Sequence, residues 1–402
     1  MTGGCESERR ACEMRMLLLR DWRQALRTPH VYRVGNSTLR VQHQLIAVLF
    51  VVIVLPLIFY AYPWILGTMC TSDGRSARAG ATNFRRYNST YPITSPVRSA
   101  AGVSYRIGII SDLDRESRDA SGKNAWYSVL KRGHLFWIPG KNSIGVTWDQ
   151  DQTRLVSTLA MNGRGMELSE LVTFDGRLLT FDDRTGIVYY LDGDQAFPWL
   201  ILMDGSGRDT KGFKSEWATV KDEQLYIGSI GKEWTTSGGE FQHNNPLWIK
   251  VVSASGETRP FDWIHNYKKL RQSIDIEFPG YMIHESGAWS EVHKSWFFLP
   301  RRCSEERYNE TRDEIMSCNV LLSADENFSN IKVKKLSNLV PIRGFSSFKF
   351  LPGSHDSIIV ALKTEEYRGQ TATYITAFTV QGQILLPDAR IAAQKFEGLE
   401  FI

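Results

Sequence analysis

The feature that most constrains the fold is an irregular repeat in the C-terminal three quarters of the chain. Each copy has a serine or glutamate, a short apolar run, a polar turn and a second apolar run, as in ELSELVTFDGRLLTF and KSEWATVKDEQLYIGS. Short apolar runs between turns rich in Asp, Gly, Asn and Ser predict strands rather than helices. The copies begin 47 to 69 residues apart, a spacing typical of the four-stranded blades of a β-propeller. The repeat therefore predicts an all-β fold, a five-bladed β-propeller.

The opening positions of the copies predict a metal site. In a propeller the first strand of each blade lines the central channel, so equivalent residues form a ring. Glutamates in one ring repel one another unless a cation neutralises them, and calcium accepts about six to eight oxygen ligands. The alternative is that these residues only cap strand ends or hydrate the channel. The candidate ligands are Ser169, Glu216, Glu285, Ser346 and Glu397, the last within the terminal run FEGLEFI.

The first hundred residues have a different character. Residues 45–67, LIAVLFVVIVLPLIFYAYPWILG, contain no charged residue and are long enough to cross a bilayer as one helix. A cleavable signal peptide is the alternative, although the apolar run is long for one and is preceded by 44 residues. We expect a cytoplasmic segment over 1–44, a transmembrane signal-anchor over 45–67, a stalk or linker over 68–102 and the propeller domain over 103–402.

The residues on either side of this span are the evidence for its orientation in the membrane. Arginines lie on both sides of it, so the positive-inside rule does not decide the topology. Acceptor triplets for N-glycosylation follow the span at Asn88, Asn309 and Asn327, although another, at Asn36, precedes it. We therefore expect a single-pass type II protein of the endoplasmic reticulum or Golgi membrane, with a lumenal propeller, or a form secreted after cleavage.

Charge and cysteine usage narrow the function classes. The net charge is only +4, and the basic residues are scattered among nearly as many acids, so we expect no nucleic-acid partner. No CxxC pair is present, which disfavours zinc and thioredoxin chemistry. Cys303 and Cys318 flank the run CSEERYNETRDEIMSC, where a disulfide and two free thiols are both open.

Several motifs resemble those of the calcium-activated nucleotidase (apyrase) family. They include YRIGIISDLDRES, DDRTGIVYYL, PGYMIHES, WFFLPRR, GFSSFKF and FEGLEFI, and the resemblance covers residues 103–402. Through the N-terminal span the chain is also similar to the membrane-anchored members. The resemblance implies a five-bladed propeller with one central calcium ion, bound by the ring residues above, that hydrolyses nucleoside diphosphates. It also allows a homodimer.

Candidate catalytic residues follow from the chemistry of phosphoryl transfer to water, which uses a metal, cations and a carboxylate that orients the water. Asp112 and Asp114 lie two apart at the end of an apolar strand, so we expect both on one face. By itself this DxD is more typical of a turn that ends a strand, and it also resembles the metal-binding motif of Golgi glycosyltransferases. The resemblance favours a place beside the attacking water, and it makes Asp183 in DDRTG and Glu167 in GRGMELS further candidates, with Asp182 beside them.

Candidate substrate-binding residues are cations and one aromatic. Arg301 and Arg302 end a strand and can clamp phosphate oxygens, unless they are a solvated pair. Trp234 offers a flat face to a nucleobase, although tryptophans in blades are commonly part of the core. The predicted set is Arg164, Lys214, Trp234 and Arg301, with Lys232 as a further source of charge.

These features together favour a calcium-dependent hydrolase of nucleoside diphosphates, UDP and GDP first, with ADP and triphosphates as further candidates. The resemblance implies that such a lumenal enzyme supports glycosylation by removing the diphosphates that glycosyltransferases release. A second hypothesis is a catalytically silent, calcium-stabilised propeller that acts as a binding module. A third is a Golgi glycosyltransferase, but the sequence lacks the alternation of strands and helices that this class requires.

Overall fold

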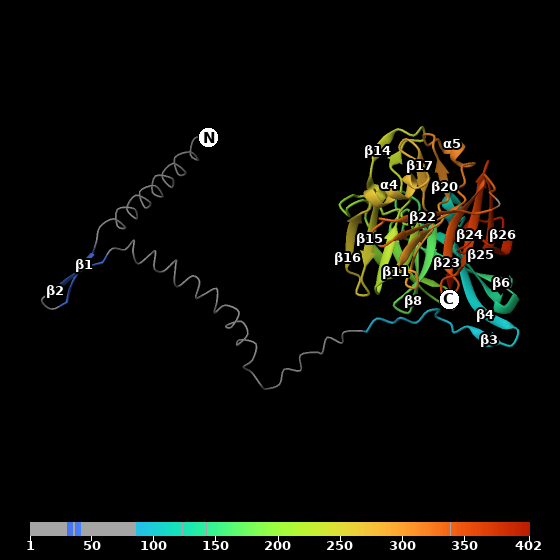
Figure 1. Cartoon of the computed structure of the whole chain (residues 1–402), viewed down its shortest axis with the longest axis horizontal. Coiled ribbons are helices and arrows are strands. Elements are labelled where there is room, and N and C mark those ends of the chain that lie inside the picture. Colours follow the sequence, from blue (N-terminus) through green and yellow to red (C-terminus); the bar gives the residue numbers. More distant parts are fainter. Residues whose placement is uncertain (1–29, 35–36, 42–85, 122–123, 142, 338) are drawn as a thin grey trace. The chain divides into compact units, whose positions relative to one another are not determined.

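The computed structural model describes residues 30–34, 37–41, 86–121, 124–141, 143–337 and 339–402 (Figure 1). They belong to two units, 1–84 and 85–402. In the first unit, β1 (His30–Val34) and β2 (Ser37–Val41) form an antiparallel hairpin. No helix within the described ranges is long and apolar enough to span a bilayer, and the predicted span at 45–67 lies outside those ranges, as does most of the predicted cytoplasmic segment and linker.

The second unit is a β-propeller built from four-stranded antiparallel sheets. In four of its blades the strands lie side by side in chain order; short turns join most antiparallel neighbours, whereas longer connections join β12 to β15 and β19 to β21. Blade 1 has β7 (Leu168–Phe174), β8 (Arg177–Asp182), β9 (Ile187–Asp192) and β10 (Gln195–Ile201); blade 2 has β11 (Trp217–Lys221), β12 (Gln224–Gly228), β15 (Trp248–Val252) and β16 (Thr258–Asp262). Blade 3 has β18 (Gly287–Ser290), β19 (Ser295–Phe298), β21 (Val320–Asp325) and β22 (Ile331–Lys335); blade 4 has β23 (Arg343–Phe350), β24 (Ile358–Tyr367), β25 (Gln370–Thr379) and β26 (Ile384–Ala392).

Blade 5 joins the two ends of the domain. The last strand, β27 (Phe396–Phe401), pairs antiparallel with β4 (Gly102–Ser111), which continues into β5 (Trp126–Ile138) and β6 (Ser143–Ser157). β3 (Val97–Ser99) pairs with the start of β4. The C-terminal strand therefore supplies the innermost strand of a blade whose other strands come from the beginning of the domain. The predicted five-bladed, all-β propeller is confirmed.

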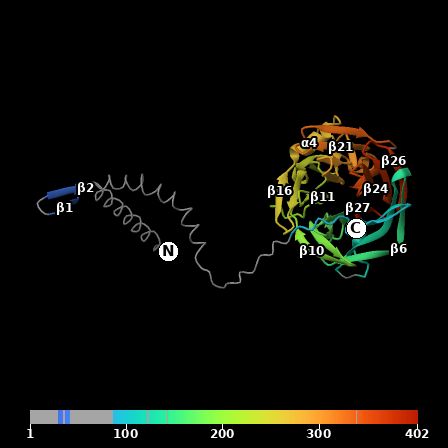
Figure 2. The same ribbon diagram turned by 60° about the horizontal axis from the view of Figure 1, so that its bottom comes forward.

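The innermost strands form a closed ring around the central channel. β7 contacts β11, β11 contacts β18, β18 contacts β23, β23 contacts β27, and β27 returns to β7. Figure 2 labels β11, β24 and β27 inside the molecule, with β16, β10, β6, β26 and β21 toward its rim. Equivalent positions of successive blades are thus neighbours, as the repeat predicts.

Large apolar side chains fill the spaces between blades. Trp217, at the start of β11, is fully buried, and its ring centroid lies 5.6 Å from that of Phe298 in blade 3. It also lies 5.8 Å from Trp263, next to the short helix α4 (Ile264–Gln272). The remaining elements lie in the connections: η2 (Asp114–Ser117), η3 (Pro139–Lys141), β13 (Trp234–Thr235), β14 (Phe241–His243), η4 (Asn245–Leu247), β17 (Tyr281–Ile283), β20 (Arg302–Ser304) and α5 (Glu310–Asp313).

The end of the predicted linker lies on the propeller. Residues 87–91, which we call the strap, border the channel mouth where β27 ends. The Tyr91 hydroxyl donates to Glu400 Oε1 at 2.9 Å, and the other Glu400 oxygen accepts from the Thr173 backbone at 2.8 Å. Asn88 N donates to Asp175 Oδ1 at 2.8 Å. These bonds explain how the buried Glu400, inside an apolar strand, is satisfied.

Candidate active site

The five candidate calcium ligands all lie on the inner strands or directly before them. Ser169, Ser346 and Glu397 lie within β7, β23 and β27; Glu216 directly precedes β11, and Glu285 lies two residues before the start of β18. Carboxylate oxygens of Glu216, Glu285 and Glu397 lie within 4.8 Å of one another. We call these five residues the ring.

Local irregularities in the strands turn ring side chains toward the channel. The pairing register shifts at Ser169 between Leu168 and Leu171, at Ser346 between Phe345 and Ser347, and at Glu397 between Phe396 and Gly398. Such a bulge inserts an unpaired residue and redirects its side chain. The repeated polar residue thus has a structural basis, because it occupies the unpaired position of an otherwise apolar strand.

The donor set of the ring fits a hard dication. The Ser346 hydroxyl is fully buried and has no hydrogen-bond partner among the described residues. Glu216 Oε1 is also buried without a hydrogen bond, although Lys214 Nζ lies 2.5 Å from it. Buried oxygens are rarely left unpaired, and hydroxyl and carboxylate oxygens are ligands that calcium prefers.

Three cations partly balance the ring, of which Arg301 and Lys395 are buried and Lys214 is partly buried. Arg301 Nη1 pairs with Glu285 and lies 2.7 Å from Glu397 Oε1. Arg301 Nη2 lies 2.5 Å from Glu366 Oε2 in β24. Lys214 pairs with both Glu216 and Asp183. Lys395, just before β27, lies 3.7 Å from Glu397. Burial disfavours the charged forms of Lys214, Arg301 and Lys395, but the adjacent carboxylates outweigh it and raise their pKa values.

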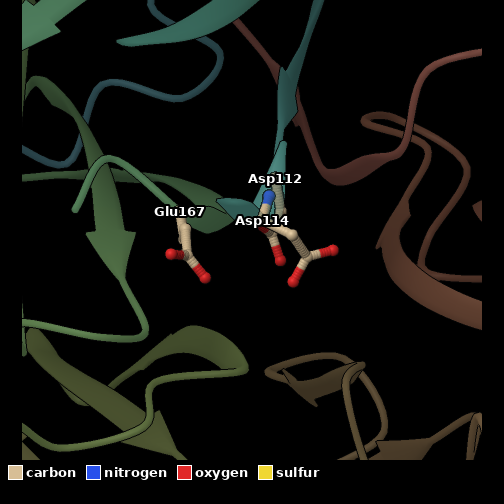
Figure 3. A group of neighbouring side chains, drawn as sticks. All are labelled: Asp112, Asp114 and Glu167. Atoms are coloured by element: carbon tan, nitrogen blue, oxygen red, sulfur yellow. The ribbon is translucent and has the colours of Figure 1, made fainter. Parts of the chain in front are cut away.

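Asp112, Asp114 and Glu167 form a second acidic group beside the ring. Their carboxylate oxygens lie within 4.8 Å of one another, and Figure 3 shows them directed to the same side from two different segments of the chain. Lys395 Nζ lies 2.8 Å from Asp112 and 2.7 Å from Asp114. It therefore joins this group to the ring.

The reason for the shared direction of the two aspartates differs from the predicted one. β4 ends at Ser111, so Asp112 and Asp114 are beyond the strand and do not follow its alternation. Instead, Asp114 N donates to Asp112 Oδ1 at 2.9 Å, and Asp114 has a φ of 48°. This turn, together with Lys395, brings the two side chains together.

The ion pairs form one continuous chain, which we call the circuit; its two ends, Glu285 and Glu216, are both ring residues. From Lys395 and Asp114 it continues through Arg164, 3.4 Å from Asp114, to Glu167, and then through Arg184 to Asp183 and Lys214. The circuit contains the carboxylates of Asp112, Asp114, Glu167, Asp183, Glu216, Glu285, Glu366 and Glu397 and the cations Arg164, Arg184, Lys214, Arg301 and Lys395. When all eight carboxyls are ionised they outnumber the five cations, and a dication would reduce that excess of negative charge.

The acids of the circuit titrate differently. Burial opposes ionisation of Asp112, but Lys395 more than compensates and lowers its pKa to about 2. The pKa of Asp114 is raised by burial and by the Asp112 charge. Burial raises the pKa of Glu216 to about 8, with Lys214 opposing the rise and Glu285 adding to it. One carboxylate is therefore held ionised beside others that resist ionisation.

Other predicted residues lie apart from the circuit. Asp182 is buried and accepts hydrogen bonds from the backbone of Met166 and Arg184, so it shapes the loop. Trp234 stacks on His243, with ring centroids 6.1 Å apart, and Lys211 lies 4.1 Å from its ring. Lys232 donates to Thr235 and to the Glu233 carbonyl.

Sequence reasoning missed three members of the circuit. Arg184 is part of the quoted motif DDRTG and Lys395 stands two residues before Glu397, so proximity to predicted site residues was the available signal. Glu366 lies in the long hairpin of blade 4, far in sequence from any predicted acid. Only the packing of blade 4 against blades 3 and 5 brings it to Arg301 and Lys395.

An open cavity of about 410 Å³ adjoins the circuit. Asp114, Glu285, Arg301 and Glu366 form part of its lining, and Arg302, which is buried, adds a second guanidinium. The side chain of Arg302 lies 3.9 Å from Asp313. The arrangement can hold a dication and a polyanionic ligand side by side, with carboxylates available to a water molecule.

Comparisons with known proteins identify the relatives of this chain. A sequence model of the apyrase family matches residues 113–402. Soluble calcium-activated nucleotidase 1 of Mus musculus is 49% identical over 332 residues, which are 83% of this chain and 82% of that protein. Its Rattus norvegicus counterpart is 49% identical over 82% of this chain and 83% of that protein. An apyrase of Cimex lectularius is 46% identical over 81% of this chain and 89% of that protein. The chain therefore belongs to the apyrase family.

Proposed function

We propose that this protein hydrolyses nucleoside diphosphates to the monophosphate and phosphate in a calcium-dependent reaction. The observation that carries the proposal is the circuit, in which a ring with orphaned buried oxygens lies beside an aspartate pair and the buried cations Arg301 and Lys395. The family relationship supports the same activity. Ser169, Glu216, Glu285, Ser346 and Glu397 would hold the calcium ion. When bound, calcium neutralises phosphate oxygens and lowers the barrier to attack by water.

The protein's own cations bind the phosphates. Arg301 and Arg302 line the cavity beside the ring and present guanidinium groups suited to bidentate contacts with phosphate oxygens. Arg164 and Lys214 extend the positive charge along the circuit. Because each of these cations except Arg302 already pairs with a carboxylate of the circuit, an incoming diphosphate replaces one anion by another and no bare charge has to be desolvated.

The two aspartates have different roles toward water. Asp112, with its pKa lowered to about 2, is a weak base and orients the water by accepting a hydrogen bond. Asp114 is about half exposed and has a raised pKa, so it is the better proton acceptor. Asp183 and Glu167 position Lys214, Arg164 and Arg184 through their ion pairs.

The cellular setting extends the proposal. A lumenal enzyme of the endoplasmic reticulum or Golgi, anchored by residues 45–67, would act on UDP and GDP released by glycosyltransferases. The disulfide Cys303–Cys318 and the exposed acceptor asparagines Asn309 and Asn327 are compatible with that compartment.

The test uses the purified full-length chain with UDP. We expect phosphate release with calcium and none with EGTA, and a loss of at least 100-fold in Glu397→Gln but not in Glu240→Gln, an exposed glutamate outside the site. Thermal stabilisation by calcium without phosphate release would overturn the proposal in favour of the silent binding module.

A further inference from the structure

A buried glutamate next to the ring, Glu170, lies outside the circuit. It directly follows Ser169 in β7, and its side chain is only 1% exposed. A buried carboxylate is costly unless its oxygens have partners. The partners of Glu170 come from β7 and β23, and β27 lies between these two inner strands around the channel. Glu170 therefore connects strands of different blades.

One oxygen of Glu170 holds the bulge of its own strand. The Leu171 backbone N–H donates to Glu170 Oε1 at 2.8 Å, and the Thr180 hydroxyl donates to the Glu170 carbonyl at 2.9 Å. Leu171 and Thr180 are the pair at which β7 and β8 resume their register after the bulge. Glu170 thus stabilises the irregularity that directs Ser169 toward the channel.

The same oxygen reaches two further bulges. The Ser347 hydroxyl donates to Glu170 Oε1 at 2.9 Å, and Ser347 Oγ accepts from the Leu399 backbone N–H at 3.2 Å. Ser347 is the residue at which β23 resumes its register after Ser346, and Leu399 follows Glu397 by two residues in β27. Two side chains therefore link the three strands whose bulges carry ring residues.

A glycine allows β27 to lie against this connection. A Cβ at Gly398 would lie 2.5 Å from the carbonyl carbon of Glu170 and 2.5 Å from the nitrogen of Leu171, so the backbones of β27 and β7 touch here. Gly398 is also the residue at which β27 resumes its pairing with β4 after Glu397. The close approach places the Glu397 bulge directly against the Glu170 bulge.

The other oxygen of Glu170 has a different partner. Lys349 Nζ lies 3.1 Å from Glu170 Oε2, and both side chains are buried. This ion pair balances the charge of the carboxylate, whereas Oε1 accepts the hydrogen bonds that join the bulges. Charge balance and positioning thus belong to separate atoms of one group, and variants can separate them.

We propose that Glu170 is a positioning residue for calcium: through the hydrogen bonds of Oε1 it holds the bulges of β7, β23 and β27 so that Ser169, Ser346 and Glu397 face one ion. The inference rests on the calcium site of the proposed function. Groups that orient metal ligands through hydrogen bonds change metal affinity by about 10- to 100-fold when they are removed.

The experiment measures the Kd of calcium by isothermal titration calorimetry with the full-length protein. Ser347→Ala breaks the link to Glu170 without unpairing a charge, and we expect Kd to rise about tenfold. Glu170→Ala should also raise Kd. Because both changes break the same link, the double variant should raise Kd by less than the product of the two single effects.

Two further variants separate positioning from charge and from general stability. Glu170→Gln combined with Lys349→Met removes both charges but keeps an acceptor oxygen, so we expect Kd within about threefold of wild type. Glu233→Ala breaks a buried ion pair with Arg271 that lies outside the inner strands. It should lower the melting temperature and leave Kd within about twofold of wild type.

Several results would overturn the positioning role. An unchanged Kd in Ser347→Ala would do so, as would single effects that multiply fully in the double variant. A rise in Kd for Glu233→Ala equal to that for Ser347→Ala would attribute the loss to destabilisation alone. Calcium binding by the wild-type protein without phosphate release from UDP would refute only the proposed function, whereas absence of calcium binding would overturn both.

Discussion

Calcium binding should compete with a proton on Glu216. In the metal-free protein this carboxyl is buried beside Glu285, and its pKa is raised from 4.5 to about 8. Calcium requires the ionised form, so binding at pH 7 first has to remove a proton from most molecules. One unit between pH and pKa corresponds to about 1.4 kcal/mol, or a tenfold weaker apparent affinity. With this pKa, the apparent affinity should rise about 50-fold between pH 6 and pH 8 and then level off.

The same shift predicts how stability depends on pH. Because the folded-state pKa of Glu216 exceeds its unfolded value, this group favours the metal-free fold most below about pH 4.5 and loses that contribution as the pH rises toward 8. Calcium would offset both causes of the loss, the burial of the ionised carboxylate and its repulsion by Glu285. The difference in melting temperature between calcium-loaded and EGTA-treated protein should therefore widen from pH 5 to pH 8.

Isothermal titration calorimetry in buffers of different ionisation enthalpy measures both the affinity and the protons released. Glu216→Gln should bind calcium more weakly and release about one proton fewer per ion, since the amide carries no exchangeable acid proton. The exposed Glu240→Gln should behave as wild type. Equal affinities at pH 6 and pH 8, or unchanged proton release in Glu216→Gln, would refute the reasoning.

Three further predictions concern stability and are measured by urea unfolding. Tyr91→Phe removes a hydrogen bond to the buried Glu400, and we expect a loss of about 1–2 kcal/mol without a change in KM; no loss would show that the strap does not contribute. Lys395→Met leaves several carboxylates without their cation and should cost about 3–5 kcal/mol in the metal-free protein, a loss that calcium should reduce; equal losses with and without calcium would contradict this. Replacing Cys303 and Cys318 by serine opens a loop with a separation of 15 residues and should cost about 3 kcal/mol under oxidising conditions, whereas reductant should abolish the difference from wild type.

The sequence is informative about the ring because its residues repeat. Ser169 and Glu397 occupy equivalent bulged positions of inner strands, and the pattern of one polar residue in an apolar run can be detected without any knowledge of packing. The five-bladed architecture follows from the same spacing. The prediction of the fold is thus confirmed where each blade repeats the same local pattern, while the role of the ring as a metal site stays a prediction.

The charged residues around the ring do not repeat from blade to blade, so the sequence spacing does not predict which of them lie together. Glu366 comes from a hairpin of blade 4 and Lys395 from the connection into β27, and only closure of the propeller brings them together at 3.1 Å. The DxD pair was predicted to lie together, but a turn and a lysine almost three hundred residues away hold it, not strand alternation. The role of Trp234 cannot be predicted from the sequence, because it depends on which side chains lie against its ring in the folded protein, and His243 is one of them.

The closing strand connects the two mouths of the channel. Lys395 pairs with the aspartates, Glu397 belongs to the ring, and Glu400 binds the strap. Five residue steps of extended chain span about 17 Å, so one short segment carries groups from the active-site end to the opposite end. Until β27 pairs with β4, the site lacks both a ring glutamate and its central lysine. Closure of the propeller and assembly of the site are therefore a single event, and a calcium ion held by Glu397, as proposed, would stabilise the same strand that completes the fold.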